Sequence, residues 1–156
     1  LKILPSKGIN IYRETERSWF HSAQRGADES ILKRGFRYLD YFVWMGSYHC
    51  QDPEELKKGE LYAVRAGRWL RPYKKSESRF DFLKIRRIKK QLDYAAKNGK
   101  IFHLWFHPHD IGINREINFR MLEEILNHYK KLNQKYGIQS MNMKEVVELY
   151  KQKYES

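Results

Sequence analysis

Hydrophobic side chains recur at helical spacing in two long segments of the chain's second half. The apolar positions are Phe82, Ile85, Ile88, Leu92 and Ala95 in residues 79–98, and Met121, Leu122, Ile125, Leu126, Tyr129 and Leu132 in residues 116–136. This spacing predicts two amphipathic helices that each bury one face. Gly99 and Gly137 follow the two segments directly, and a glycine in that position commonly ends a helix.

Shorter patterns predict three more helical segments. Asn142 and Glu145 are spaced like a capping pair and open a last helix, whose apolar face is formed by Met143, Val146, Val147 and Tyr150. Residues 30–45 predict a helix that ends at Gly46 and turns Ile31, Leu32, Gly35, Leu39, Phe42 and Met45 inward. Residues 1–6 resemble the last turn of a helix.

Short apolar runs between these helices predict strands over residues 9–12, 60–64, 100–107 and 138–141. The order of helix, strand, helix, strand and helix, with very short turns, favours parallel strands wrapped by helices. The predicted fold class is therefore α/β. In such folds, ligands gather at the carboxyl ends of the strands.

The run KIFHLWFHPHD, residues 100–110, carries the strongest chemical signal. It predicts a buried strand that delivers His107 and His109 to its carboxyl end. His103 lies four residues before His107, a step of about 13 Å along a strand, so these two side chains cannot share a metal. We expect His103 to be a core histidine.

Length and composition indicate one domain over residues 1–156, because 41% hydrophobic and 15% aromatic content can close a core. No apolar run approaches the ~18 residues of a membrane span, and no signal-peptide pattern is present. The single cysteine, Cys50, excludes a disulfide framework and a cysteine-based zinc finger. Since the sequence starts with Leu1, we expect it to be a piece of a longer protein.

The formal net charge of +12 makes nucleic acid, anionic lipid and acidic glycans partner classes to weigh. The densest basic stretch is Lys84, Arg86, Arg87, Lys89 and Lys90. These charges fall on the predicted 79–98 helix, where we expect them to form a solvated outer face. No zinc finger, RNA-binding sheet motif or phosphate-binding glycine loop is present, so nucleic acid is not the favoured partner.

Four motifs resemble the C-terminal half of polysaccharide deacetylases with the NodB homology domain, and the resemblance covers most of the chain. The motifs are residues 1–13, the Arg68-Trp-Leu-Arg71-Pro72 segment, residues 99–110 and residues 137–146. The resemblance implies part of a distorted (β/α) barrel and metal-dependent removal of acetyl groups from N- or O-acetylated sugars. The implied partner is an acetylated polysaccharide or oligosaccharide. Family members are often secreted or associated with the cell envelope.

The cofactor implied by the resemblance is a divalent metal, usually zinc. In the family, an Asp-Asp pair and a His-x-x-x-His motif toward the N-terminus supply the metal ligands and the base. This sequence contains no Asp-Asp pair, and we see no constellation of site residues around His21, His49 or His128. We therefore expect the metal ligands in a missing N-terminal half and no activity from this chain alone.

His107 matches the histidine of the family's last motif, which is expected to act as a general acid or to stabilise the tetrahedral intermediate. An imidazole suits a proton donor because it exchanges protons near neutral pH. Trp105 would stack on a sugar ring or fill the core, and His109 would line the substrate groove or cap the following loop. Arg71 would contact substrate or be solvated, and Asp110 would shape the loop or orient a histidine.

Two functions remain open from the sequence. The first is a deacetylase-type hydrolase in which His107 is the only carried-over catalytic residue. The second is a non-catalytic module that binds acidic glycan or nucleic acid on a degenerate barrel.

Overall fold

The computed structural model describes residues 3–16, 18, 21, 30–46 and 48–155. In chain order the elements are α1 (Ile3–Ser6), β1 (Ile11–Glu14), α2 (Ile31–Asp40), η1 (Pro53–Glu55), β2 (Lys57–Lys58), β3 (Leu61–Arg65), β4 (Arg68–Trp69), η2 (Lys75–Phe80), α3 (Asp81–Asn98), β5 (Leu104–Trp105), α4 (Pro108–Gly112), α5 (Arg115–Tyr136) and α6 (Met143–Tyr154). The two η elements are 3-10 helices. Residues 1–2 of the predicted first helix lie outside the described residues.

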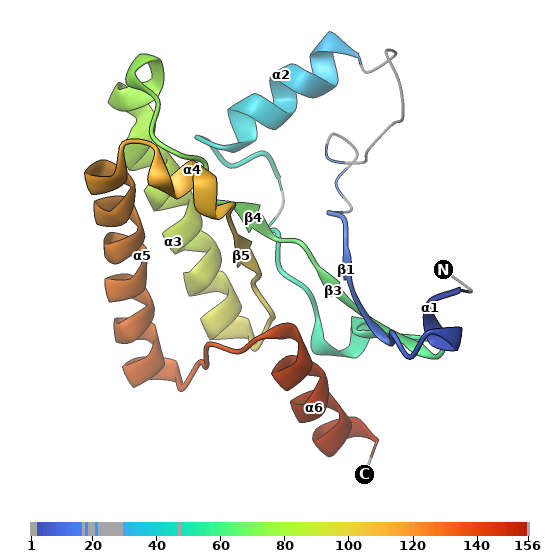
Figure 1. Cartoon of the computed structure of the whole chain (residues 1–156). Coiled ribbons are helices and arrows are strands. Elements are labelled where there is room, and N and C mark those ends of the chain that lie inside the picture. The colour runs from blue at the N-terminus through green and yellow to red at the C-terminus, as the bar shows by residue number, and fades with distance from the viewer. Residues whose placement is uncertain (1–2, 17, 19–20, 22–29, 47, 156) are drawn as a thin grey trace.

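The strands form two small sheets beside the helices (Figure 1). One sheet has the order β1-β3-β2, in which β1 and β3 are parallel and β2 is antiparallel to β3. The other sheet pairs β4 with β5 in parallel. Two of the three strand pairs among the described residues are therefore parallel, although neither joins residues 100–107 to residues 138–141 as the alternation predicts. In the described part of the chain the two sheets are separate, so the barrel stays a prediction.

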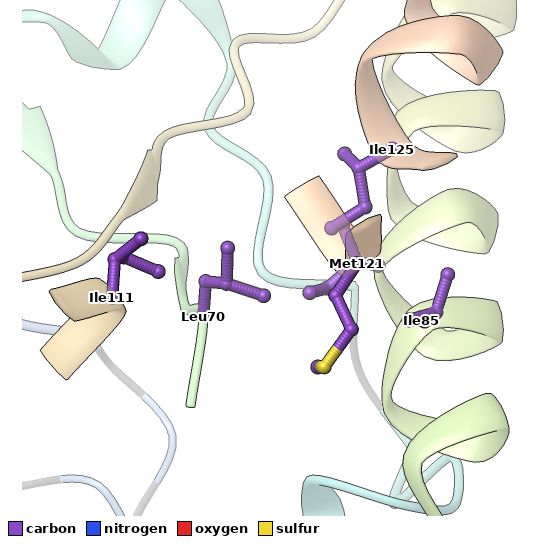
Figure 2. Packing of buried hydrophobic residues seen from close by; sticks show 6 residues of the cluster. Leu70, Ile85, Ile111, Met121 and Ile125 are labelled. Atoms are coloured by element: carbon purple, nitrogen blue, oxygen red, sulfur yellow. The ribbon is translucent and has the colours of Figure 1, made fainter. Parts of the chain in front are cut away.

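A hydrophobic core lies where α3 and α5 pack against each other and against the segments after β4 and β5. Its buried members are Leu70, Ile85, Ile88, Ile111, Met121 and Ile125 (Figure 2). Both long helices end as predicted, because Gly99 and Gly137 adopt left-handed backbone with φ of 60° and 69°. The capping box of Asn142 and Glu145 at the start of α6 is also confirmed.

Two predicted strands are wrong in extent or in existence. Within residues 100–107 only Leu104–Trp105 forms a strand, and both of its side chains are half-buried rather than buried. Ile101 adds an isolated bridge to Gln51. Residues 138–141 form no strand and connect α5 to α6 as a loop. Only Ile138 and Met141 of these four residues are apolar, and no strand in the described part of the chain pairs with them.

The predicted inward face of residues 30–45 is wrong. Helix α2 stops at Asp40, and Ile31, Leu32 and Leu39 are 84%, 70% and 49% exposed. The two long helices also leave Phe82 and Leu126 exposed, although the pattern placed both residues inward. The periodic spacing predicted where the helices lie, but it did not predict which of their apolar residues other parts of the protein cover.

The expected solvated face of the basic stretch in α3 is wrong at two positions. Lys84 and Arg87 are each 3% exposed and face carboxylates instead of solvent. Among the described helices, none is long and apolar enough to cross a membrane.

Candidate functional site

Two tryptophans lie side by side where β4 and β5 end. Trp69 and Trp105 are register partners in the parallel pair, and their rings stack with centroids 5.8 Å apart and planes 14° apart. Parallel pairing accounts for this contact, because directly paired residues project their side chains to the same face of a sheet. The pair forms a half-buried aromatic surface at the carboxyl ends of both strands.

His107 lies next to this aromatic pair. Its backbone is extended, and Pro108 starts the short helix α4 directly after it, so the imidazole sits at the exit of β5. The ring centroid is 5.5 Å from that of Trp105 and 6.4 Å from that of Trp69, in edge-on arrangements. The side chain is exposed, so a bound molecule can reach it.

His109 contacts His107, and Arg71 contacts Trp69. The His109 ring stacks on His107 at 5.2 Å, and its Nε2 is 3.5 Å from Asp110 Oδ1. The Arg71 guanidinium lies 5.7 Å from the Trp69 ring and 4.6 Å from the ring of Tyr41. The structure therefore joins all four predicted site residues into one set of ring contacts, with Trp69 as the link between Arg71 and the others.

The sequence left two alternatives for Arg71, contact with substrate or solvation. The structure excludes a solvated side chain. Its side chain is 11% exposed, and its Nη2 donates to Glu77 Oε1 at 3.2 Å. Asp110 lies beside His109 rather than His107. A histidine is thus near Asp110, but it is not the proposed proton donor.

The loop that follows His107 is fixed by a buried amide. Asn118 in α5 accepts a hydrogen bond from the Tyr73 backbone N–H at 2.7 Å through Oδ1. Its Nδ2 donates to the carbonyls of Asp110 at 3.2 Å and of Ile113. Since Asn118 is 1% exposed, these bonds are shielded from water and hold the ends of both strands in place.

Gly67 brings β4 close to the segment before β5. A Cβ atom at this position would lie 2.7 Å from the His103 carbonyl oxygen and 2.9 Å from that of His49. The Gly67 and Arg68 N–H groups both donate to the His103 carbonyl, at 3.1 Å and 2.9 Å. The His103 side chain is half-buried, and burial lowers its pKa. The absence of a side chain at Gly67 therefore sets the spacing on which the tryptophan pair depends.

A cavity of about 240 Å³ opens beside the tryptophan pair. Its lining comes from the exit of β1, the β3–β4 turn and β4, together with Trp105, Tyr41 and His21. Arg13 at the end of β1 is exposed, and its guanidinium carbon lies 4.9 Å from the Trp105 ring centroid. The lining thus combines aromatic rings with the cations of Arg13 and Arg68 and the carboxylates of Glu14 and Glu16.

Behind the cavity, Asp40 forms a buried network of charges that the sequence did not reveal. Its Oδ2 is 2.7 Å from Arg68 Nη1 and 3.0 Å from His49 Nε2, and its Oδ1 is 3.2 Å from Arg87 Nη2. His21 Nε2 is 3.4 Å from the same Oδ2. The prediction that no constellation surrounds His21 and His49 is therefore wrong.

The network lowers the pKa of its central group, Asp40. Burial alone would raise the pKa of Asp40, but interactions with His21 and His49 and the positive charge of Arg68 outweigh burial and hold that pKa well below its usual range. Asp40 is 0% exposed, so it is an ionised carboxylate held by paired charges.

His21, Asp40 and His49 are the donor types that zinc prefers, and their ligand atoms lie within 4.8 Å of one another. The surroundings do not fit zinc. Both carboxylate oxygens of Asp40 already face a guanidinium, and a cation bound to Oδ2 would be forced against Arg68. We therefore assign these residues to a buried ion-pair network and derive no metal chemistry from them.

Comparisons with protein-family models, with curated proteins and with solved structures found no match. We therefore infer the function from the geometry of the site.

The site residues missed by sequence reasoning share one property. Trp69, Arg13 and Asp40 make their contacts with residues far away in the chain. The Arg68-Trp-Leu-Arg71-Pro72 motif was the one available signal for Trp69, because it places an aromatic ring between two arginines. No comparable signal marked Asp40.

Proposed function

We propose that this chain forms part of a polysaccharide deacetylase-like hydrolase that removes acetyl groups from N- or O-acetylated sugars. The observation that supports it best is the exposed His107 at the end of β5, in ring contact with the stacked Trp69 and Trp105. Aromatic faces pack against the apolar faces of sugar rings, and a neighbouring imidazole can then deliver a proton.

In this proposal Trp69 and Trp105 orient the sugar, and His107 acts as the general acid. Water adds to the acetyl carbonyl carbon and gives a proton to the base that the sequence resemblance implies, and the bond from the carbonyl carbon to nitrogen or oxygen then breaks. His107 gives its proton to the departing amine or hydroxyl, and acetate is the second product. The divalent metal implied by the sequence resemblance, zinc by expectation, remains part of the proposal, with ligands other than the Asp40 network.

The test is acetate release by the protein expressed from the complete reading frame that encodes it, with zinc, from N-acetylated chitotriose and O-acetylated xylotriose. We expect zinc-dependent release that falls at least about 100-fold in His107→Gln, because a positioned proton donor contributes that much. His128→Gln is the matched control, since His128 pairs with Asp93 in a different part of the structure. The chain of residues 1–156 alone is expected to release no acetate.

Equal release by His107→Gln and the unchanged protein would contradict the role of His107. No release from either sugar, together with retained sugar binding, would favour the second candidate. That candidate is a non-catalytic module for acidic glycan, and the observation that favours it is the exposed Arg13 over Trp105 at the cavity, in a chain with a formal charge of +12.

A further inference from the structure

Arg13 is a cationic residue that lines the cavity. Its side chain is exposed and lies over the ring of Trp105, with 4.9 Å between the guanidinium carbon and the ring centroid. Among the described residues, no carboxylate is within ion-pair distance of Arg13. A guanidinium held flat against an aromatic ring keeps its edge free to bind an anion.

The two glutamates that line the same cavity are already paired. Glu14 forms an ion pair with Lys58, and its Oε2 is 3.9 Å from Arg65 Nε. Glu16 Oε2 is 3.2 Å from His49 Nδ1. Their negative charges are therefore matched by neighbouring cations, whereas no carboxylate in the described part of the chain pairs with Arg13.

Arg68 and Trp69 also line the cavity. Among the described residues, Trp69 Nε1 and Arg68 Nε and Nη2 have no hydrogen-bond partner, but these atoms are themselves buried. Arg68 is 2% exposed, and its Nη1 binds Asp40. The exposed Arg13 guanidinium is therefore a donor that a bound group can reach, and because guanidinium nitrogens can only donate, the complementary ligand group is an acceptor.

We infer that this cavity binds the carboxylate of an acidic sugar, such as a uronic acid unit, in an acetylated glycan. The inference rests on the proposed function and names the class of its substrate. Arg13 would pair with the carboxylate, while Trp69 and Trp105 contact the ring of the same or an adjacent sugar. The cavity volume of about 240 Å³ suits one such unit, since it is smaller than the ~300–1,000 Å³ of sites for drug-sized ligands.

Calorimetric titration with trigalacturonic acid tests this assignment, and its fully methyl-esterified form is the neutral probe. We expect the acid to bind and the ester to bind at least about tenfold more weakly, because a charge-assisted pair is lost. Arg13→Gln should weaken binding of the acid by a similar factor. Arg86→Gln removes one positive charge from an exposed position on α3 and should leave binding unchanged.

A second variant tests the aromatic part of the cavity. Trp105→Leu should weaken binding of both the acid and its ester, whereas Arg13→Gln should weaken binding of the acid alone. Equal affinity for acid and ester, or equal losses in Arg13→Gln and Arg86→Gln, would overturn the inference. Tighter binding of an oligothymidylate than of trigalacturonic acid, lost in Arg13→Gln, would also overturn it and assign the cavity to nucleic acid.

Failure of this inference differs from failure of the proposed function. Acetate release from neutral acetylated sugars, unaffected by Arg13→Gln, would remove the carboxylate subsite and keep the hydrolase. Arg13-dependent binding of trigalacturonic acid without acetate release from any acetylated sugar would keep the subsite and remove the hydrolase.

Discussion

Helices α3 and α5 are held in the fold by buried apolar side chains, whereas the buried residue of helix α2 is charged. The α3–α5 layer buries apolar side chains, with Ile88 and Ile125 each 2% exposed (Figure 2). Helix α2 projects at the top of the view in Figure 1, and its one buried residue is the charged Asp40. Its aliphatic residues Ile31 and Leu32 are 84% and 70% exposed.

This difference separates two kinds of stabilisation. Hydrophobic burial is non-directional and tolerates small changes in shape. A buried charge network adds little net stability compared with apolar packing, but removing one member leaves the others uncompensated. The α3–α5 layer should therefore respond gradually to substitution, and the attachment of α2 should respond sharply to the loss of the Asp40 carboxylate.

The largest expected effect is from Asp40→Asn. The change leaves Arg68 and Arg87 buried without their counter-charge, so we expect the free energy of unfolding to fall by about 3–5 kcal/mol. Urea unfolding followed by circular dichroism measures it. Asp93→Asn is the matched control, because Asp93 pairs with His128 in a partly exposed position and should cost about 0–1 kcal/mol. Equal losses in the two variants would contradict the role given to Asp40.

A pair of aliphatic truncations tests the other half of the comparison. Ile125→Ala opens a cavity in the α3–α5 core and should cost about 2–5 kcal/mol. Leu39→Ala on α2 removes a side chain that is 49% exposed and should change stability by no more than about 0.5 kcal/mol. The same urea measurement applies. A large loss from Leu39→Ala would mean that α2 is held by apolar contacts after all.

Gly67→Ala tests the close approach of β4 to β5. Its Cβ would meet backbone carbonyl oxygens at 2.7 Å and 2.9 Å, so we expect a loss of about 1–3 kcal/mol and a changed tryptophan fluorescence spectrum. Gly35→Ala in α2 has nothing within 4 Å of the new Cβ and should stabilise by about 0.5–1 kcal/mol. Effects of the same sign in both variants would contradict the steric explanation.

The smallest expected effect is a dependence on acid pH. Because the pKa of Asp40 is lowered in the folded protein from an ordinary value near 3.8, its stabilisation is complete above that value and is lost as the pH falls below it. Between pH 4 and pH 3, the unchanged protein should lose about 1 kcal/mol more stability than Asp40→Asn. An equal loss of stability between pH 4 and pH 3 in the two proteins would contradict a lowered pKa of Asp40.

The sequence was most informative where the determinants are local. Helix α5 was predicted over residues 116–136 and spans Arg115–Tyr136, since an apolar stripe and Gly137 lie within one continuous segment. Trp105, His107 and His109 were found for the same reason, because one strand end presents all three. Hydrophobic periodicity depends on positions close together in the sequence, so it predicts elements that lie within one continuous segment.

Prediction failed where contacts join distant segments. The Asp40 network brings together His21, His49, Arg68 and Arg87, and no pattern in the sequence marks positions spread so widely. An aspartate at the end of an amphipathic helix is ordinarily a surface residue. The burial of Asp40 follows only from where β4 and α3 deliver their arginines.

The most direct test of the central claim is where an acetylated sugar binds. Proton–nitrogen NMR of the tryptophan indoles during titration with N-acetylated chitotriose and O-acetylated xylotriose measures this. We predict shifts of the Trp69 and Trp105 Nε1–H signals and of the His107 ring protons, with Trp44 as the unaffected reference, because it does not line the cavity. Shifts at Trp44 without shifts at Trp69, Trp105 and His107 would contradict the proposed site.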